Sequence, residues 1–108
     1  MNPFGRALRW ARTQKNLSLD ALAKKIGRPK SKGYLSMIEN GVCPPPTTSV
    51  IEKLARTLDV STSELMLIAY AAKAPKRIRT WVIELVDIVP FKSIPRRPPK
   101  EKLPLSRI

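Results

Sequence analysis

The chain has 108 residues, 43% of them hydrophobic, which suits a single domain with one core. Lys and Arg number 21 against 8 Asp and Glu, so the formal net charge of +13 indicates a polyanionic partner, most commonly nucleic acid and otherwise an anionic membrane surface. With no histidine, one cysteine and no clustered carboxylates, the sequence lacks the residues of catalytic and metal sites, so we predict no enzyme activity, no metal and no cofactor.

Two helices are predicted at the start of the chain, each with a residue suited to cap it. Asn2 followed by Pro3 is typical of a helix start, because proline at the first helical position loses no hydrogen bond, and this helix should extend to about Lys15. Ser18 can cap a second helix, in which apolar residues recur at helical spacing up to Gly27. The first helix carries two candidate phosphate contacts, with solubility as their alternative role: Arg6 and Arg9.

The third predicted helix lies within the run KSKGYLSMIENG, residues 30–41, where Ser31 can cap its start and Gly41 can end it. At about 100° per residue, Tyr34, Leu35 and Ile38 gather on one side and need a core. The opposite side is small, polar and basic at its beginning, which suits insertion into a DNA major groove. This outward side consists of Lys32, Gly33, Ser36 and Asn40, with Met37 at its edge.

Two more helices complete the predicted body of the protein, residues 1–74. Thr47 or Ser49 opens a fourth helix after a run of three prolines. Ser61 and Glu64 have the spacing of a capping box, so a fifth helix should begin there and reach about Lys73. Short helices joined by connections of a few residues indicate an all-α fold.

Residues 75–89, PKRIRTWVIELVDIV, are predicted to form an additional amphipathic helix, and a strand is the alternative because many of them are β-branched. The helix can cover the apolar fifth helix within its own subunit, or it can form a two-fold dimer interface. The sequence leaves both roles open. The candidate interface residues are Ile78, Trp81, Val82, Leu85, Val86 and Val89.

Residues 90–108 differ in character from the rest of the chain. They hold five prolines, six basic residues and one acidic residue, a composition that predicts a flexible basic tail. Arg96 and Arg97 are candidate contacts to phosphates or to a minor groove, and a passive linker is the alternative.

Two stretches of the body together resemble a known family. The run LSLDALAKKIGRPKSKGYLSMIENG is followed by PPPTTSVIEKLARTLDVSTSELM, and the order and spacing of their pieces are similar to lambda-repressor-like, or XRE-type (Cro/repressor), helix-turn-helix transcription regulators. The resemblance covers roughly residues 4–72. It implies a compact five-helix domain that binds double-stranded DNA sequence-specifically as a homodimer, with the third helix as the recognition helix.

The resemblance also implies roles for individual residues. The family usually has a glutamine that meets a phosphate at the start of the second helix, and Leu19 stands there, so Arg28 and Lys30 are candidates to replace that contact. Glu39 is implied to form a structural ion pair with Arg12. The candidate DNA-binding residues are therefore Arg28, Lys30, Ser31, Lys32, Gly33, Ser36, Met37 and Asn40.

These features together predict a sequence-specific DNA-binding transcription regulator, acting as a repressor and as a homodimer, in which Lys32 is the candidate reader of a guanine. One alternative is a protein-interaction module, such as an antitoxin or phage regulator, whose C-terminal helix and tail bind a partner protein. Another is a non-specific nucleoid-type DNA binder. The longest apolar run, residues 65–72, is far shorter than the about 20 residues that span a bilayer, so we expect no membrane partner and a cytoplasmic, nucleoid-associated protein.

Overall fold

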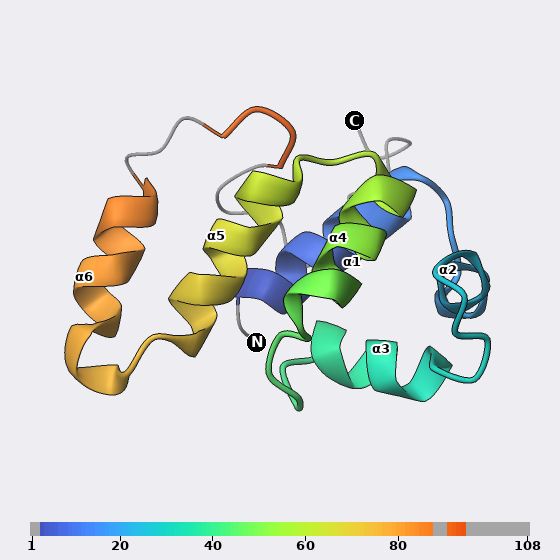
Figure 1. The fold of residues 1–108 in the computed structure, drawn as a ribbon, viewed down its shortest axis with the longest axis horizontal. Helices are drawn as coiled ribbons and strands as arrows, with labels where there is room; N and C mark the ends of the chain where they lie inside the picture. Colours follow the sequence, from blue (N-terminus) through green and yellow to red (C-terminus); the bar gives the residue numbers. More distant parts are fainter. Residues whose placement is uncertain (1–2, 88–90, 95–108) are drawn as a thin grey trace, which may run out of the picture.

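The computed structural model describes residues 3–87 and 91–94 (Figure 1). These residues include no strand, so the predicted all-α class is confirmed, and the strand alternative is wrong for residues 76–87, the described part of the segment 75–89 that forms a helix. Figure 1 shows α3 along one edge of the molecule and α6 beside α5. In chain order the helices are α1 (Pro3–Gln14), α2 (Leu19–Lys25), α3 (Lys32–Glu39), α4 (Thr48–Leu58), α5 (Thr62–Lys73) and α6 (Lys76–Asp87).

The helix starts are capped in different ways. The Ser18 hydroxyl accepts a hydrogen bond from Ala21 N at 3.0 Å, which is the side-chain cap predicted for α2. Ser31 and Thr47 stand at the N-cap positions of α3 and α4, but their hydroxyls make no cap hydrogen bond. Thr47 therefore opens α4 as predicted, whereas the side-chain cap predicted at Ser31 does not form, although α3 begins where expected.

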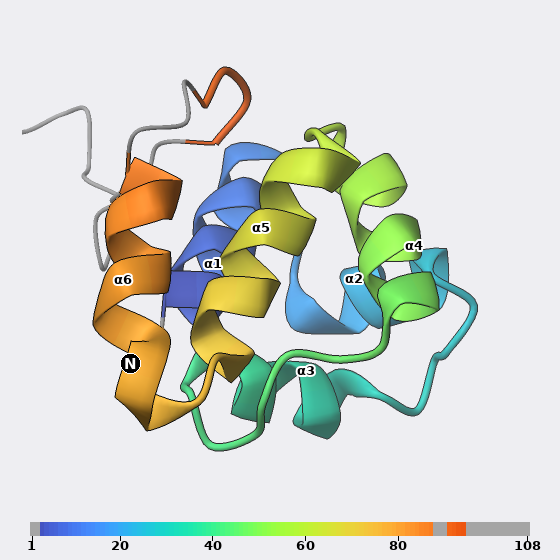
Figure 2. The same ribbon diagram turned by 60° about the vertical axis from the view of Figure 1, so that its left-hand side comes forward.

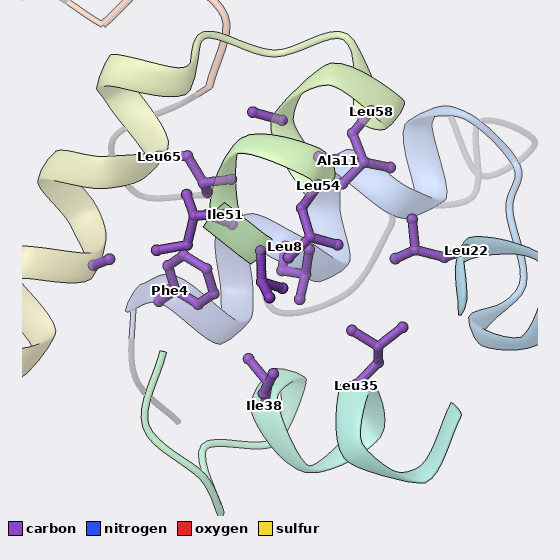
Figure 3. Packing of buried hydrophobic residues seen from close by; sticks show 14 of the residues in the cluster. Phe4, Leu8, Ala11, Leu22, Leu35, Ile38, Ile51, Leu54, Leu58 and Leu65 are labelled. Carbon is purple, nitrogen blue, oxygen red and sulfur yellow. The ribbon is translucent and has the colours of Figure 1, made fainter. Parts of the chain in front are cut away.

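The core lies among α1, α4 and α5, and α3 closes it from one side (Figure 3). Phe4, Leu8 and Leu54 are fully buried there. Leu35 and Ile38 point from α3 toward the same cluster and are also fully buried. Burial of side chains of this size stabilises a fold by about 1.5–3 kcal/mol each before conformational entropy is subtracted. The apolar side of α3 is thus the side that holds it to the protein.

Helices α1 and α3 touch at Gly5. A Cβ atom added at this position would lie 2.5 Å from the backbone oxygen of Glu39 and 2.7 Å from that of Ile38, which is closer than real Cβ contacts allow. Glycine therefore permits this separation of the two helices. The C-terminal end of α3 rests directly on α1.

Two separate segments of the chain cap the start of α5. The Ser61 hydroxyl accepts a hydrogen bond from Glu64 N at 3.2 Å, which is one half of the predicted capping box. In place of the other half, Ser61 N donates to the Ser93 hydroxyl at 2.8 Å, and that hydroxyl donates to Glu64 Oε1 at 3.1 Å. Ser93 is therefore inserted between the two residues of the box.

Residues 91–94 dock on the start of α5, so the prediction of a flexible tail is wrong for this stretch (Figure 1). The carboxylate of Glu64 accepts the backbone N–H groups of Lys92, Ser93 and Ile94, each at 3.0 Å, and the Ile94 side chain is buried in the core. Burial raises the pKa of Glu64, but these hydrogen bonds lower it by a larger amount, so the pKa lies below the ordinary value of 4.5.

Helix α6 packs along α5 (Figure 2). Arg79 donates to the Ala74 carbonyl from Nη2 at 2.9 Å and from Nε at 3.1 Å, so the junction between the two helices is closed by a side chain of α6. Val82 and Val86 are half-buried. Helix α6 therefore covers α5 within the subunit, which is one of the two roles left open by the sequence. Val89, another candidate interface residue, lies outside the described residues.

Candidate nucleic-acid interface

Helices α2 and α3 are joined by a turn in which backbone hydrogen bonds fix the path of the chain. Gly27 has a φ of 77°, a left-handed conformation that glycine adopts without steric cost. Arg28 N donates to Ala23 O at 2.9 Å, which completes a Schellman-type end of α2. Ser31 N donates to Arg28 O at 2.9 Å, and the chain then enters α3. This turn sets the position of α3 relative to α2.

Five of the candidate DNA-binding residues lie together on the side of α3 that faces away from the core. Four of them are exposed to solvent, and Ser36 is half-buried. Tyr34, expected on the core side, is 36% exposed, so the core covers only part of it. The outward set consists of Lys32, Gly33, Ser36, Met37 and Asn40.

The Glu39 carboxylate is buried between α3 and α1, with 1% of the residue exposed. Arg12 donates to it from Nε at 2.6 Å and from Nη2 at 2.9 Å, a bidentate ion pair. Arg12 Nη1 also donates to Leu17 O at 2.8 Å. The two residues implied to pair by the family resemblance are therefore in contact. A buried charge is costly without a partner, so this pair ties the end of α3 to α1.

Arg9, a candidate phosphate contact, is engaged within the protein. Its Nε lies 3.3 Å from Glu39 Oε1, and its Nη2 donates to Asn40 Oδ1 at 2.7 Å. Asn40 Nδ2 donates in turn to Ser36 O at 2.9 Å. The Asn40 amide is thus held by both α1 and α3, which leaves it little capacity for a two-bond contact with adenine. Sequence spacing gave no signal for this network, because Arg9 and Asn40 are far apart along the chain.

The turn and the start of α3 carry positive charge without an internal counterion. Arg28, Lys30 and Lys32 are exposed, and none of them forms an ion pair with another described residue. Some other surface cations do have acidic neighbours; Lys24 Nζ, for example, lies 3.5 Å from Asp20 Oδ2. Three cations without an ion pair to a described residue therefore lie on or next to the outward side of α3.

Gly33 has no packing role within the described protein. It lies on the outward side of α3, and a Cβ atom added there would meet no atom within 4 Å. Glycine inside a helix costs about 1 kcal/mol relative to alanine. Packing within the described protein therefore does not require glycine at this position. Close approach of an external surface to the helix backbone would require it.

The remaining candidate phosphate contacts are Arg6 on α1 and two arginines after α6. Arg6 is half-buried, and its Nε is shielded from solvent without a hydrogen-bond partner among the described residues. Arg96 and Arg97 lie outside the described residues.

Two properties of the described residues bear on other kinds of site. They contain no helix with the combination of length and apolar character that a bilayer crossing requires. Nor do three or more His, Cys, Asp or Glu side chains gather in this part of the chain in a way that could hold a metal ion.

Comparison with protein families assigns the class. Residues 8–65, more than half of the chain, match the model of the helix-turn-helix family, and this range contains α2, the turn and α3. The chain belongs to the lambda-repressor-like, XRE-type helix-turn-helix family. The resemblance seen in the sequence is therefore confirmed.

The chain is similar to curated proteins from Bacillus over the same region. The HTH-type transcriptional regulator SlrR of Bacillus subtilis is 41% identical over 62 residues, which are 57% of this chain and 40% of SlrR. The HTH-type transcriptional regulator SinR is 39% identical over 63 residues, which are 58% of this chain and 55% of SinR, both in Bacillus subtilis and in Bacillus licheniformis. The chain thus spans about half the length of these relatives, and none of their names is that of an enzyme. No solved structure matches the chain significantly.

Proposed function

We infer that the protein is a sequence-specific, double-stranded DNA-binding transcription regulator, a repressor, that docks α3 in the major groove as a homodimer. The observation that carries this inference is the outward side of α3, which is polar, flanked by uncompensated cations and uncovered by described residues, while the apolar side is buried. Family membership and the names of SlrR and SinR support the same class.

The contacts divide into those that position the protein and those that read bases. Arg28 and Lys30 bind phosphates, which gives affinity for any sequence. Lys32 donates to the edge of a guanine, and Gly33 allows the helix backbone to approach the base pairs closely. Asn40 donates to a phosphate oxygen, because its carbonyl oxygen already accepts a hydrogen bond from α1.

A homodimer places two copies of α3 about 34 Å apart, one turn of DNA, and therefore binds an inverted repeat. Occupancy of such an operator represses the adjacent gene. The protein acts in the cytoplasm, at the nucleoid.

Selection of bound duplexes from a random DNA pool tests this function, with fluorescence anisotropy on the recovered sequences. We expect a recurrent inverted repeat and, for about six to ten phosphate contacts, an affinity that falls about 10³- to 10⁵-fold between about 50 and 200 mM salt. Equal binding of all sequences would instead indicate a non-specific nucleoid-type binder. Absence of duplex binding at low salt would contradict both readings.

A protein-interaction module is the second candidate function, because α6 exposes large apolar side chains, with Trp81 67% exposed. In that case Trp81→Ala abolishes capture of the partner protein and leaves the chain folded, because this side chain is largely exposed. The repressor account predicts that the same variant leaves residual binding to single half-sites and lowers the affinity for the complete inverted repeat.

A further inference from the structure

Helix α6 leaves part of its apolar side uncovered. Ile78, Trp81 and Leu85 are 40%, 67% and 62% exposed, and their spacings of three and four residues align them along one side of the helix. Val82 and Val86 lie next to this stripe and are half-buried. Helix α5 therefore covers one part of the apolar side of α6, and each residue of the stripe formed by Ile78, Trp81 and Leu85 remains at least 40% exposed among the described residues.

Charges beside the stripe are arranged in a self-complementary way. Arg77 precedes Trp81 by four residues and Glu84 follows it by three, so both lie along the same edge of the stripe, two helical turns apart. Both are exposed, and neither forms an ion pair with a described residue. This edge has a positive charge at one end and a negative charge at the other. In a second copy of the helix that runs in the opposite direction, the same edge presents these charges in the reverse order, so the two edges are complementary.

We propose that a second copy of this chain docks on the exposed stripe, with the two α6 helices antiparallel about a two-fold axis close to Trp81. Arg77 then faces Glu84 of the partner subunit, and the symmetry repeats this ion pair on the other side of the axis. Ile78 lies near Leu85 of the partner subunit. The inference rests on the proposed homodimeric regulator and specifies the surface through which it dimerises.

A parallel pairing of the two helices fits these observations less well. In a parallel pair of α6 helices, one edge of the stripe on the first helix faces the opposite edge of the stripe on the second helix. The edge of α6 opposite Arg77 and Glu84 contains Val86 and Arg79, and Arg79 already bonds to the end of α5. A parallel pair would therefore set Arg77 and Glu84 against an edge that offers them no complementary charges, whereas the antiparallel pair sets them against each other.

The seam is short. Helix α6 has 12 residues and is therefore about 18 Å long, so it buries less surface than the about 800 Å² per partner of a standard interface. The dimer should accordingly dissociate on dilution, and binding of both subunits to one operator should stabilise it.

Charge reversal tests the pairing directly, with sedimentation equilibrium of the full 108-residue chain over a concentration series. We expect Arg77→Glu and Glu84→Arg each to raise the dimer dissociation constant about tenfold or more, because each sets like charges against one another. The double variant Arg77→Glu/Glu84→Arg should return to within about threefold of the wild-type value, as should an equimolar mixture in which the two single variants pair with each other. Trp81→Ala should abolish the dimer and retain the helical circular dichroism of the wild type, because the side chain is largely exposed. Lys24→Glu on α2 is the matched charge-reversal control and should dimerise normally.

Two results would overturn the inference: a wild-type chain that stays monomeric at every concentration, or a dimer whose loss in the single variants is not reversed in the double variant. If the wild-type chain stays monomeric and binds another protein through Trp81, the exposed stripe of α6 is a surface for that protein and the inference is also overturned. The duplex selection separates the two proposals. A monomer that selects a DNA sequence retains the regulator and loses this interface, whereas a charge-paired dimer that binds no DNA retains the interface and loses the regulator.

Discussion

Helices α3 and α6 are both amphipathic, but the sides that they turn to solvent differ in chemistry. Leu35 and Ile38 of α3 are fully buried, and its exposed side is mainly polar and basic, with Met37 41% exposed at its edge. The apolar side of α6 is only half covered, with Trp81 and Leu85 more than 60% exposed. Contact with hydrated, charged DNA requires the first kind of surface, and a dry contact between proteins requires the second. The comparison supports the two proposals that α3 binds DNA and that α6 mediates assembly.

The largest effect is expected from breaking the anchor beneath α3. Arg12→Met leaves the buried Glu39 carboxylate with Arg9 alone and should lower the free energy of unfolding by about 3 kcal/mol, measured by urea denaturation. Lys15→Met is the matched control: its Nζ lies 3.6 Å from Asp59 Oδ2 in an exposed pair, and its loss should cost less than about 1 kcal/mol. Equal losses for the two variants would show that Glu39 does not depend on Arg12.

Much of the fold was predictable because local chemistry determines it. Ser18 caps α2 as expected, and the left-handed glycines Gly27 and Gly41 lie where helices were predicted to end. The hydroxyls of Ser31 and Thr47 form no caps, because turn geometry decides whether a hydroxyl can reach a free N–H. Sequence position alone does not reveal that geometry.

Contacts between distant segments were the least predictable. The pairing of Arg12 with Glu39 was available only through the family resemblance, and the bond from Arg9 to Asn40 was not anticipated. Residues 91–94 were included in a tail whose average composition is basic and proline-rich. The signal that could have separated them is local: Phe91 and Ile94 are apolar residues three apart, and both contact the core.

Loss of the basic tip of α3 should change specificity more than stability. Lys32→Ala should cost about 1–3 kcal/mol at one operator base and relax the preference there, measured by anisotropy on the selected duplex and on duplexes changed at single positions. Arg28→Ala is the comparison variant and should weaken binding to all sequences alike, with a salt slope smaller by about 1. If Lys32→Ala reduces affinity equally for the cognate and random duplexes, Lys32 is a phosphate contact and not a base reader.

The segment that follows α6 offers a pH test. Glu64 has a lowered pKa in the folded chain, so its carboxylate stabilises the docked residues 91–94 fully above pH 4.5, and this contribution is lost as the pH falls from 4.5 through the folded pKa. At neutral pH, Glu64→Gln should reduce the hydrogen-exchange protection of the Lys92, Ser93 and Ile94 amides about tenfold. Unchanged protection would mean that the burial of Ile94 alone holds the segment.

The smallest expected effect on stability comes from Gly33→Ala. The added Cβ meets nothing within the described protein, so the variant should gain about 0.5–1 kcal/mol from helix propensity while binding the selected duplex more weakly. Gly5→Ala is the matched control on α1. It should destabilise the fold by about 1–3 kcal/mol, because its Cβ would collide with the backbone of α3. Full DNA affinity in Gly33→Ala would place that face of α3 away from the duplex.

The division of roles between α3 and α6 is tested most directly by the shifts of backbone amide NMR signals when the selected duplex is added. At a protein concentration at which the free chain is already dimeric, the account predicts the largest shifts at the basic turn and along the outward side of α3, from Arg28 to Asn40, with only small shifts on the exposed stripe of α6. Large shifts confined to α6, with the α3 signals unmoved, would contradict it.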